Sequence, residues 1–401
     1  MFHLAVSDSH IFVYWTDAPG IYQYNFLDGR DNLIAPLSPS VKVEGIKIKD
    51  MIVTNQGDTI FLIATQTFLE RPTFPGVIRT GQLFICGDYK KFGLSPSRII
   101  KKSPNFDQIN CEKPVKAVSV YGNRLALLYD DSSFKPPTDP VERRLIEVNS
   151  KLYDLLLSIQ PLRGNIPTDY GSILPAGFTL KRTLTSITQS ENRLRVMGCC
   201  PEEPNRIYEL ELDVNPQPPS APKMPPAPHS LGYKKINTGW KQWGFNGIER
   251  RGVESWYQVF GSDHLWLRTN DNMYYYTRYP DRLGQTGIEE KNGLFCGNEN
   301  YLFYIGSDGC LYYQRIVHEH PSALLDMKKP LFPAVNYHDK VLHKMEMVGH
   351  NLFILFSLTA ASPPLVHIYS VKNIENIGLT QLQFLPSCQT TILKSKRESE
   401  A

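Results

Sequence analysis

The fold is decided by one stretch, WYQVFGSDHLWLRTNDNMYYY at residues 256–276. An apolar run leads into a small polar turn, a second apolar run follows, and a second turn rich in Asn and Asp leads into a tyrosine-rich run. Short apolar runs bounded by such turn residues are typical of β-hairpins. The stretch therefore predicts three consecutive antiparallel strands.

The same pattern occurs seven times along the 401 residues of the chain. The first turns of its copies begin at or near Ser7, Asn55, Tyr121, Ser190, Gly261, Gly297 and Val348. The second strands have as their first apolar residues Ile11, Ile60, Leu125, Leu194, Leu265, Leu302 and Leu352. Recurrence of one supersecondary unit along a chain indicates a repeat architecture.

Sandwiches, barrels and propellers are all built from short strands with regular turns. Repetition separates them, because each blade of a propeller is a four-stranded sheet that packs its faces against its neighbours. The run before each first turn would be the innermost strand of a blade, and the run after it would be the second strand. We therefore expect an all-β fold, a single seven-bladed β-propeller over residues 1–401 with inserted loops and at most one or two short helices.

The repeats are unevenly spaced, and the long intervals contain insertions at residues 70–80 and 132–142. We expect four units in residues 1–214, a proline-rich connection over 215–230, three units in 231–394 and a polar tail over 395–401. The connection contains seven prolines, which exclude it from a helix or a central strand. It is expected to be an extended spacer, although such segments also dock into aromatic grooves of other proteins.

One segment, residues 141–160, has helical periodicity. Its apolar stripe consists of Leu145, Val148, Leu152, Leu155 and Leu156. The opening of the segment at 143–148 also suits a strand of the third unit. In that case the helix would begin near Asn149 or Ser150, since both residues are acceptable N-caps.

The composition of the chain limits which cellular compartment and which kinds of partner are expected. Apolar residues make up 41% of the chain and charged residues 21%, as in a globular protein, and the net charge of +3 is too small to indicate nucleic acid or a membrane surface as an electrostatic partner. The seven cysteines are an odd number without zinc-ligand spacing, and no Asn-x-Ser/Thr sequon occurs. With no apparent signal peptide or transmembrane segment in the sequence, we expect a cytoplasmic or intracellular protein.

Units five and six resemble tectonin-type propeller repeats. The resemblance rests on the order of residues 256–276, on the preceding Trp240 and Trp243, and on Gly297-Asn298 with Leu311-Tyr312-Tyr313 in the sixth unit. Phe303 occupies the position of the family's tryptophan in that unit, and the resemblance covers roughly 80 of the 401 residues. It implies a binding propeller, either for glycans or for protein and membrane partners in trafficking.

Aromatic residues are the candidate binding side chains. They are Trp266, Tyr274, Tyr275, Tyr276, Tyr279, Tyr312 and Tyr313. Sugars stack on exposed rings, and protein interfaces are enriched in Tyr and Trp. Because successive side chains of a strand point to opposite faces, packing between blades should claim most of these rings and leave one or two for binding.

Residue patterns for catalysis and metal binding are weak. His318 and His320 could lie on one face of a strand, but no third metal ligand is near them in the sequence. Cys199 and Cys200 could form a vicinal redox pair, and adjacent thiols in a turn are usually inert. The chain contains no GxSxG, P-loop, GxGxxG or HExxH motif. We therefore predict no catalytic residue, no metal and no cofactor.

The sequence thus favours a non-enzymatic scaffold that binds a protein partner. Its inserted loops at 70–80, 131–142 and 215–230 are the expected docking segments, since binding residues concentrate on the loops of rigid scaffolds. A glycan-binding propeller is the alternative, and a hydrolase with its site in a central channel is the third hypothesis.

Overall fold

The computed structural model of the chain contains β-strands as the only regular elements among the residues that it describes. These residues are 2–15, 20–28, 31–36, 46–53, 59–69, 78–88, 108–111, 115–121, 124–130, 155–161, 168–172, 184–190, 193–200, 203–213, 234–235, 241–243, 253–285, 290–317, 324–384 and 390–396. No helix able to cross a bilayer occurs within these ranges.

The described strands form seven antiparallel sheets. The first contains β1 (Phe2–Val6), β2 (His10–Trp15), β3 (Gly20–Asn25) and β4 (Asp31–Pro36). The second contains β5 (Ile46–Val53), β6 (Thr59–Leu69), β7 (Ile78–Asp88) and β8 (Gln108–Cys111), and the third β9 (Val115–Tyr121), β10 (Arg124–Asp130), β11 (Leu155–Pro161) and β12 (Thr168–Ser172). The fourth contains β13 (Leu184–Gln189), β14 (Arg193–Cys200), β15 (Glu203–Asp213), β16 (Lys234–Lys235) and β17 (Lys241–Trp243).

The last three sheets follow the same plan. The fifth contains β18 (Val253–Gln258), β19 (Leu265–Thr269), β20 (Met273–Tyr276) and β21 (Tyr279–Gln285). The sixth contains β22 (Glu290–Gly297), β23 (Tyr301–Gly306), β24 (Leu311–Val317), β25 (Leu324–Leu325) and β26 (Lys329–Pro330). The seventh contains β27 (Val341–Val348), β28 (Asn351–Ser357), β29 (Pro364–Ser370), β30 (Gly378–Phe384) and β31 (Thr390–Lys396).

The predicted strand order is confirmed in every sheet. The strand before each first turn lies at one edge and pairs with the strand after that turn, as β1 pairs with β2 and β27 with β28. All seven apolar anchors lie in the second strands, and those whose side chains the structure describes are buried, as Ile11, Leu194, Leu302 and Leu352 illustrate. The all-β class is thereby confirmed, while the count of seven blades in one ring stays a prediction.

The chain divides into two compact units. Unit 1 combines Met1–Asn110 with Asn272–Ala401, and unit 2 is Cys111–Asp271. Within unit 1 the edge strands β22, β27, β1 and β5 contact one another in that order, and within unit 2 β9 contacts β13, which contacts β18. Contact between the first strands of successive sheets is the packing expected of propeller blades.

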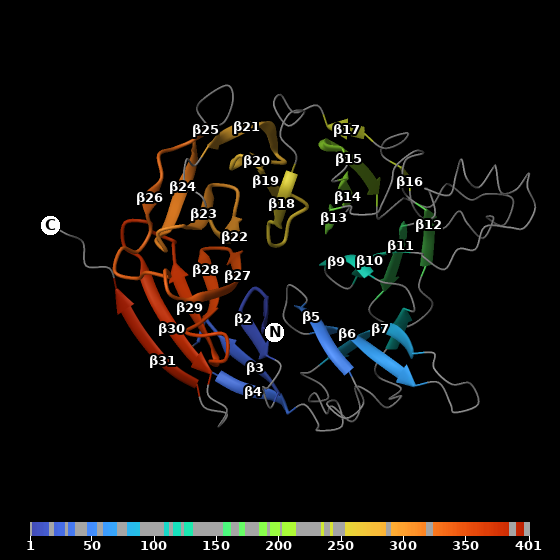
Figure 1. The fold of residues 1–401 in the computed structure, drawn as a ribbon, viewed down its shortest axis with the longest axis horizontal. Helices are drawn as coiled ribbons and strands as arrows, with labels where there is room; N and C mark the ends of the chain where they lie inside the picture. The colour runs from blue at the N-terminus through green and yellow to red at the C-terminus, as the bar shows by residue number, and fades with distance from the viewer. Residues whose placement is uncertain are drawn as a thin grey trace, which may run out of the picture. The chain divides into compact units, whose positions relative to one another are not determined.

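In unit 1, the seventh sheet packs against the first sheet. The Phe2 ring stacks on the His343 ring with centroids 4.0 Å apart, and Lys344 Nζ donates a hydrogen bond of 2.9 Å to the Leu4 carbonyl. Figure 1 shows the blue strands β2–β4 next to the red strands β27–β30. The two ends of the chain thus build one continuous part of unit 1.

The repeated turn also has a repeated geometry. A backbone N–H at or just after the end of the third strand donates to a carbonyl of the first turn in the first, sixth and seventh sheets. The pairs are Phe26 to Ser9 at 3.0 Å, Ile316 to Asn300 at 2.8 Å and Val371 to His350 at 2.8 Å. The sequence repeat is therefore a structural repeat down to single hydrogen bonds.

The structure corrects three expectations. Residues 155–160 are not helical, because Leu155–Pro161 forms β11, whose backbone pairs with β10 from Asp130 to Arg124. The rest of the predicted helix, residues 141–154, lies outside the described residues. Strands β16 and β17 pair with β15, so the fourth sheet takes strands from both sides of residues 215–230 in the sequence rather than ending before them. Part of the expected tail belongs to β31, which continues to Lys396.

Candidate interaction surface

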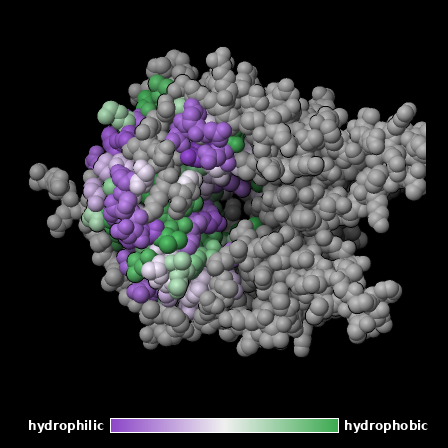
Figure 2. All heavy atoms as spheres, viewed as in Figure 1, coloured by the Kyte–Doolittle hydropathy of each residue, from purple (hydrophilic) through white to green (hydrophobic). Residues whose placement is uncertain are grey.

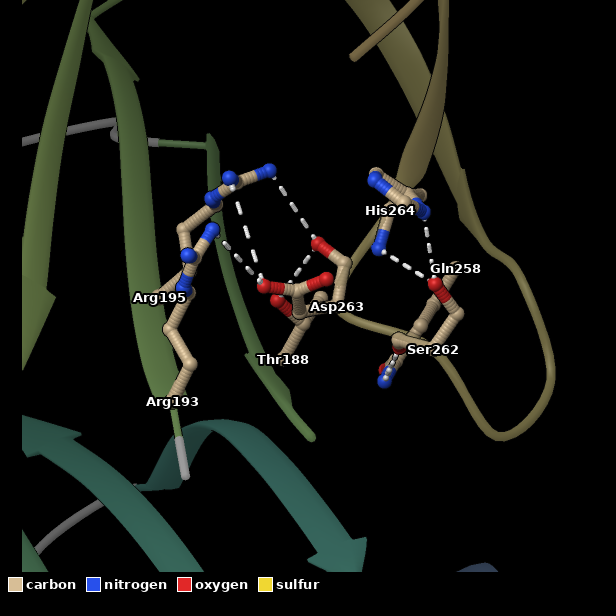
Figure 3. Close-up of polar contacts among 7 residues, drawn as sticks. All are labelled: Thr188, Arg193, Arg195, Gln258, Ser262, Asp263 and His264. Carbon is tan, nitrogen blue, oxygen red and sulfur yellow. Dashed lines mark hydrogen bonds and ion pairs between the residues drawn. The ribbon is translucent and has the colours of Figure 1, made fainter. Parts of the chain in front are cut away.

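The turn between β18 and β19 is anchored to the fourth sheet within unit 2 (Figure 3). The Asp263 carbonyl accepts hydrogen bonds from Thr188 Oγ1 at 3.1 Å and from Arg195 Nη1 at 3.4 Å. The Asp263 carboxylate lies 3.8 Å from Arg193 Nη1 and 4.0 Å from Arg195 Nη2. Asp263 is only 7% exposed, so this cluster holds two sheets together and is not open to a ligand.

Short hydrogen bonds fix the shape of the same turn. Ser262 Oγ lies 2.8 Å from His264 Nδ1 and accepts the His264 backbone N–H at 3.1 Å, while Gln258 Nε2 donates to the Ser262 carbonyl at 3.4 Å (Figure 3). The corresponding turns of the first and sixth sheets also contain an acidic residue, Asp8 and Glu299, and both are exposed. Asp263 differs from them in being buried.

Four of the predicted binding residues are core residues. Trp266, Tyr274, Tyr275 and Tyr276 are each 0% exposed, so they present no ring face to a ligand in this structure. The Tyr274 ring lies 5.4 Å from the Phe295 ring and 6.4 Å from the Tyr304 ring of the next sheet in unit 1. Packing between sheets, the alternative weighed from the sequence, accounts for these contacts.

Tyr312 is part of the surface, and its ring has two described neighbours. The ring stacks on Tyr304 with centroids 5.7 Å apart, and Lys328 Nζ lies 5.6 Å from its centroid. The hydroxyl donates a hydrogen bond of 2.6 Å to Asp308 Oδ2. This hydrogen bond raises the pKa of Tyr312 to about 12. The ring is thus fixed in place, with its hydroxyl committed to an internal partner.

Tyr313 points to the other face of β24 and is half-buried. Its ring meets that of Tyr301 edge-on, with centroids 6.2 Å apart, and Arg315 is the next side chain on this face. Tyr279, the last predicted binding residue, lies in β21, and its side chain is outside the described residues. Of the seven predicted residues, the structure therefore leaves Tyr312 and Tyr313 at a described surface.

The residues next to these tyrosines were not predicted from the sequence as binding residues. The outer side of β24 pairs with two short strands, β25 and β26, and the residues between them bulge outward. Met327 in this bulge is 80% exposed and Leu324 in β25 is 40% exposed. We call this surface the sixth-sheet edge and define it as Tyr312, Tyr313, Arg315, Leu324, Met327, Lys328 and Lys329. Only the adjacent Lys328 and Lys329 could have drawn attention in the sequence, because nothing local shows that the outer strand is interrupted.

A buried polar network lies elsewhere in unit 1, in the seventh sheet and the segment before it. The Tyr337 hydroxyl lies 2.6 Å from both His367 Nδ1 and the Tyr369 hydroxyl, and His367 Nε2 lies 2.9 Å from Gln381 Oε1. Burial lowers the pKa of His367 to about 4, and the charge of nearby Lys340 acts in the same direction against the hydrogen bond to Gln381. Burial also raises the pKa of Tyr337 and of Tyr369. At neutral pH this network is uncharged and closed to solvent.

Several predicted features fall outside the described residues. They are His318, His320, the side chains of Cys199 and Cys200, and most or all of the loops 70–80, 131–142 and 215–230. Within the described part of the chain, no group of three or more His, Cys, Asp or Glu side chains is placed to hold a metal ion.

Comparison with known proteins identifies the fold. No protein-family model matches the chain, and no curated protein matches it. Prolyl oligopeptidase B from Galerina marginata superposes with a TM-score of 0.51 at 8% identity, covering 100% of this chain and 51% of that one. Hsv2p from Kluyveromyces lactis gives 0.47 at 8% identity over 100% and 99%, and AztD from Citrobacter koseri gives 0.43 at 9% identity over 98% and 99%. The chain is a β-propeller, and it spans about half the length of the first of these proteins.

Proposed function

We propose that this β-propeller is a non-enzymatic interaction scaffold and that the sixth-sheet edge is its principal described contact surface for a protein partner. The observation that carries the proposal is the 80% exposure of Met327 near two half-buried tyrosines and two exposed lysines. Exposed apolar side chains grouped with Tyr and Arg are typical of protein interfaces. A propeller is a rigid base for such a surface, because each blade is held between its neighbours.

The tectonin resemblance supports the same class of function, a binding propeller, at the same sheet. The glycan alternative has one specific observation in its favour, the half-buried pair Tyr301 and Tyr313 on one face of the sixth sheet. A sugar would need a free ring face there. Tyr312 is less suited, since its ring stacks on Tyr304 and lies 5.6 Å from Lys328 Nζ.

The test is affinity purification of partners from the native source with three forms of the chain. These are the wild type, Met327→Glu in the edge, and Leu358→Glu as a matched control, since Leu358 is also an exposed apolar residue at 56% exposure. We expect a stoichiometric partner with the wild type and the control and its loss with Met327→Glu. Equal recovery with all three forms would exclude the edge as the contact surface.

A glycan array run in parallel separates the two binding hypotheses. The scaffold proposal expects no signal for any sugar class. A signal that Tyr313→Ala abolishes, with no stoichiometric protein partner, would replace the scaffold by a glycan-binding propeller.

A further inference from the structure

We infer that the partner of the sixth-sheet edge is an acidic peptide segment that carries an apolar anchor side chain. This inference rests on the proposed function and adds the chemistry of the partner. It is drawn from the shape of the interrupted outer strand, from its charges and from its exposed apolar groups.

The bulge that forms the edge is a fixed structure. The backbone N–H of Asp326 donates to the Arg315 carbonyl at 2.8 Å, and Gln314 Nε2 donates to the Asp326 carbonyl at 2.8 Å. The Asp326 side chain in turn accepts the Met327 N–H at 2.7 Å. The Met327 side chain therefore projects into water from a held backbone, and a partner would not have to order this segment on binding.

The charges of the edge are unbalanced. Arg315, Lys328 and Lys329 outnumber the two nearby carboxylates, Asp326, which lies 3.7 Å from Lys329 Nζ, and Asp308, which accepts the Tyr312 hydroxyl. Among the described side chains, neither Arg315 nor Lys328 forms an ion pair, and both residues are exposed. The Lys328 ammonium is held above the Tyr312 ring instead. Carboxylates on a partner would complement these two cations.

The apolar groups give the second element of recognition. Met327 lies in the bulge, and Leu324 lies in β25 next to it. Methionine adapts to irregular apolar side chains of a partner. Figure 2 shows hydrophilic side chains with hydrophobic areas between them on the described part of the molecular face in view. One apolar side chain of the partner is therefore expected to be the anchor, and acidic residues to flank it.

A peptide fits these groups better than a membrane does. An extended segment of about six residues, at about 3.3 Å per residue, would reach from Lys329 to Leu324. Anionic membranes are recognised by clusters of about four to eight Lys and Arg residues. The edge has three cations and two nearby carboxylates, Asp326 and Asp308, which is fewer cations than such a cluster contains.

The experiment is selection of random peptides displayed on phage against the immobilised full-length chain. We expect enrichment of sequences in which Asp or Glu flanks one Leu, Met or Phe. A synthetic peptide of the enriched sequence is then titrated against the wild type, the double variant Arg315→Glu/Lys328→Glu, and Lys372→Glu. Lys372 is an exposed lysine of the seventh sheet and serves as the charge-reversal control.

The double variant should bind the peptide at least about 10-fold more weakly than the wild type does, and the affinity of the control should differ less than about 2-fold. Affinity of the wild type should also fall as salt is raised, because exposed charges are screened. Peptides without acidic enrichment, or equal binding by the double variant, would overturn the inference. So would binding to phosphatidylserine vesicles that is lost in the double variant while the peptide is not bound.

Failure here is distinguishable from failure of the scaffold. If a stoichiometric partner from the native source still depends on Met327 but no acidic peptide binds, the scaffold stands and only the partner chemistry is wrong. All three variants alter exposed residues, and circular dichroism of each should match the wild type.

Discussion

Among the glycines of unit 1 with left-handed backbones, Gly309 and Gly349 differ in what surrounds them. Gly309, with φ of 78°, lies beneath the segment that contains the His338 backbone nitrogen and the Asn336 side chain, both of which an added Cβ would strike. Gly349, with φ of 56°, has nothing within 4 Å of the same position. The pair therefore separates the cost of a strained backbone from the cost of a steric conflict.

Substitution of each glycine by alanine should show this difference. Gly349→Ala should lower the free energy of unfolding by about 1 kcal/mol, the cost of a left-handed conformation for alanine. Gly309→Ala should lower it by about 3 kcal/mol, because the conflict with the His338 backbone adds to that cost. Urea unfolding of both variants checks the prediction, and equal losses would contradict it.

His367 makes the stability of unit 1 depend on pH. Its pKa falls from 6.5 to about 4 on folding, because the ring is buried and the charge of nearby Lys340 acts in the same direction. The native state thus binds fewer protons than the unfolded state between these two values. The stabilisation is complete above pH 6.5 and is lost as the pH falls toward about 4.

The variant His367→Gln should remove this dependence. Over the same pH interval the wild type should lose up to about 3 kcal/mol more stability than the variant, as expected for a shift of this size. Urea unfolding midpoints of both proteins, measured along a pH series, give the comparison. Parallel curves would show that His367 does not titrate in this way.

At the scale of single residues, the sequence predicted the type of side chain but not its exposure. Tyr274, Tyr275 and Tyr276 suggested binding because they are aromatic and adjacent, yet all three are buried. Strand alternation could place only one or two of them toward a core if the sheet had one solvent face. In this sheet both faces are covered, and that depends on neighbouring sheets that no local pattern reveals.

Among the elements, the turn between the first two strands shows how acidic residues of corresponding turns take different roles. Asp263 in the fifth sheet is buried against Arg195, whereas Glu299 in the corresponding turn of the sixth sheet pairs with Arg278 at 3.2 Å in an exposed ion pair. Exposed pairs contribute little to stability, and removing one partner of a buried pair costs much more.

Replacing each acid by alanine tests this contrast. Asp263→Ala should lower the free energy of unfolding by about 2 kcal/mol, since Arg195 would remain buried without its carboxylate. Glu299→Ala should change it by less than about 0.5 kcal/mol. Thermal and urea unfolding measured side by side provide the test, and a large effect of Glu299→Ala would refute the assignment of roles.

The sequence predicted the elements well where two signals agreed. Turn residues and apolar alternation coincide around Leu265 and Leu302, and both strands are present as expected. The sequence signals were misleading at Leu155 and Leu156, where a helical stripe predicted a helix and the structure has β11. Pairing of this strand with β10 overrode local periodicity, because a leucine run fits either element.

For the whole molecule, unit 1 depends on contacts between the two ends of the chain. The Phe2 ring stacks on His343 in β27, the first strand of the last sheet. Strands far apart in sequence are therefore neighbours, and loss of one should loosen the other.

Phe2→Ala should speed amide hydrogen exchange in β27 and leave β10 of unit 2 unchanged, because the stacked ring stabilises the contact between β1 and β27. Leu27→Ala is the control, since Leu27 belongs to the first sheet region but is 71% exposed. Hydrogen exchange followed by mass spectrometry resolves these strands. Exchange in β27 that is the same in both variants would contradict the prediction.

The contact between β1 and β27 also sets the order of events during synthesis. Translation delivers Phe2–Val6 more than 300 residues before its neighbour Val341–Val348. Contacts of such long sequence separation form slowly, so β1 must wait with one side uncovered. A premature stop codon before position 341 would thus deprive β1 of a neighbour, and such products should be held by chaperones or degraded.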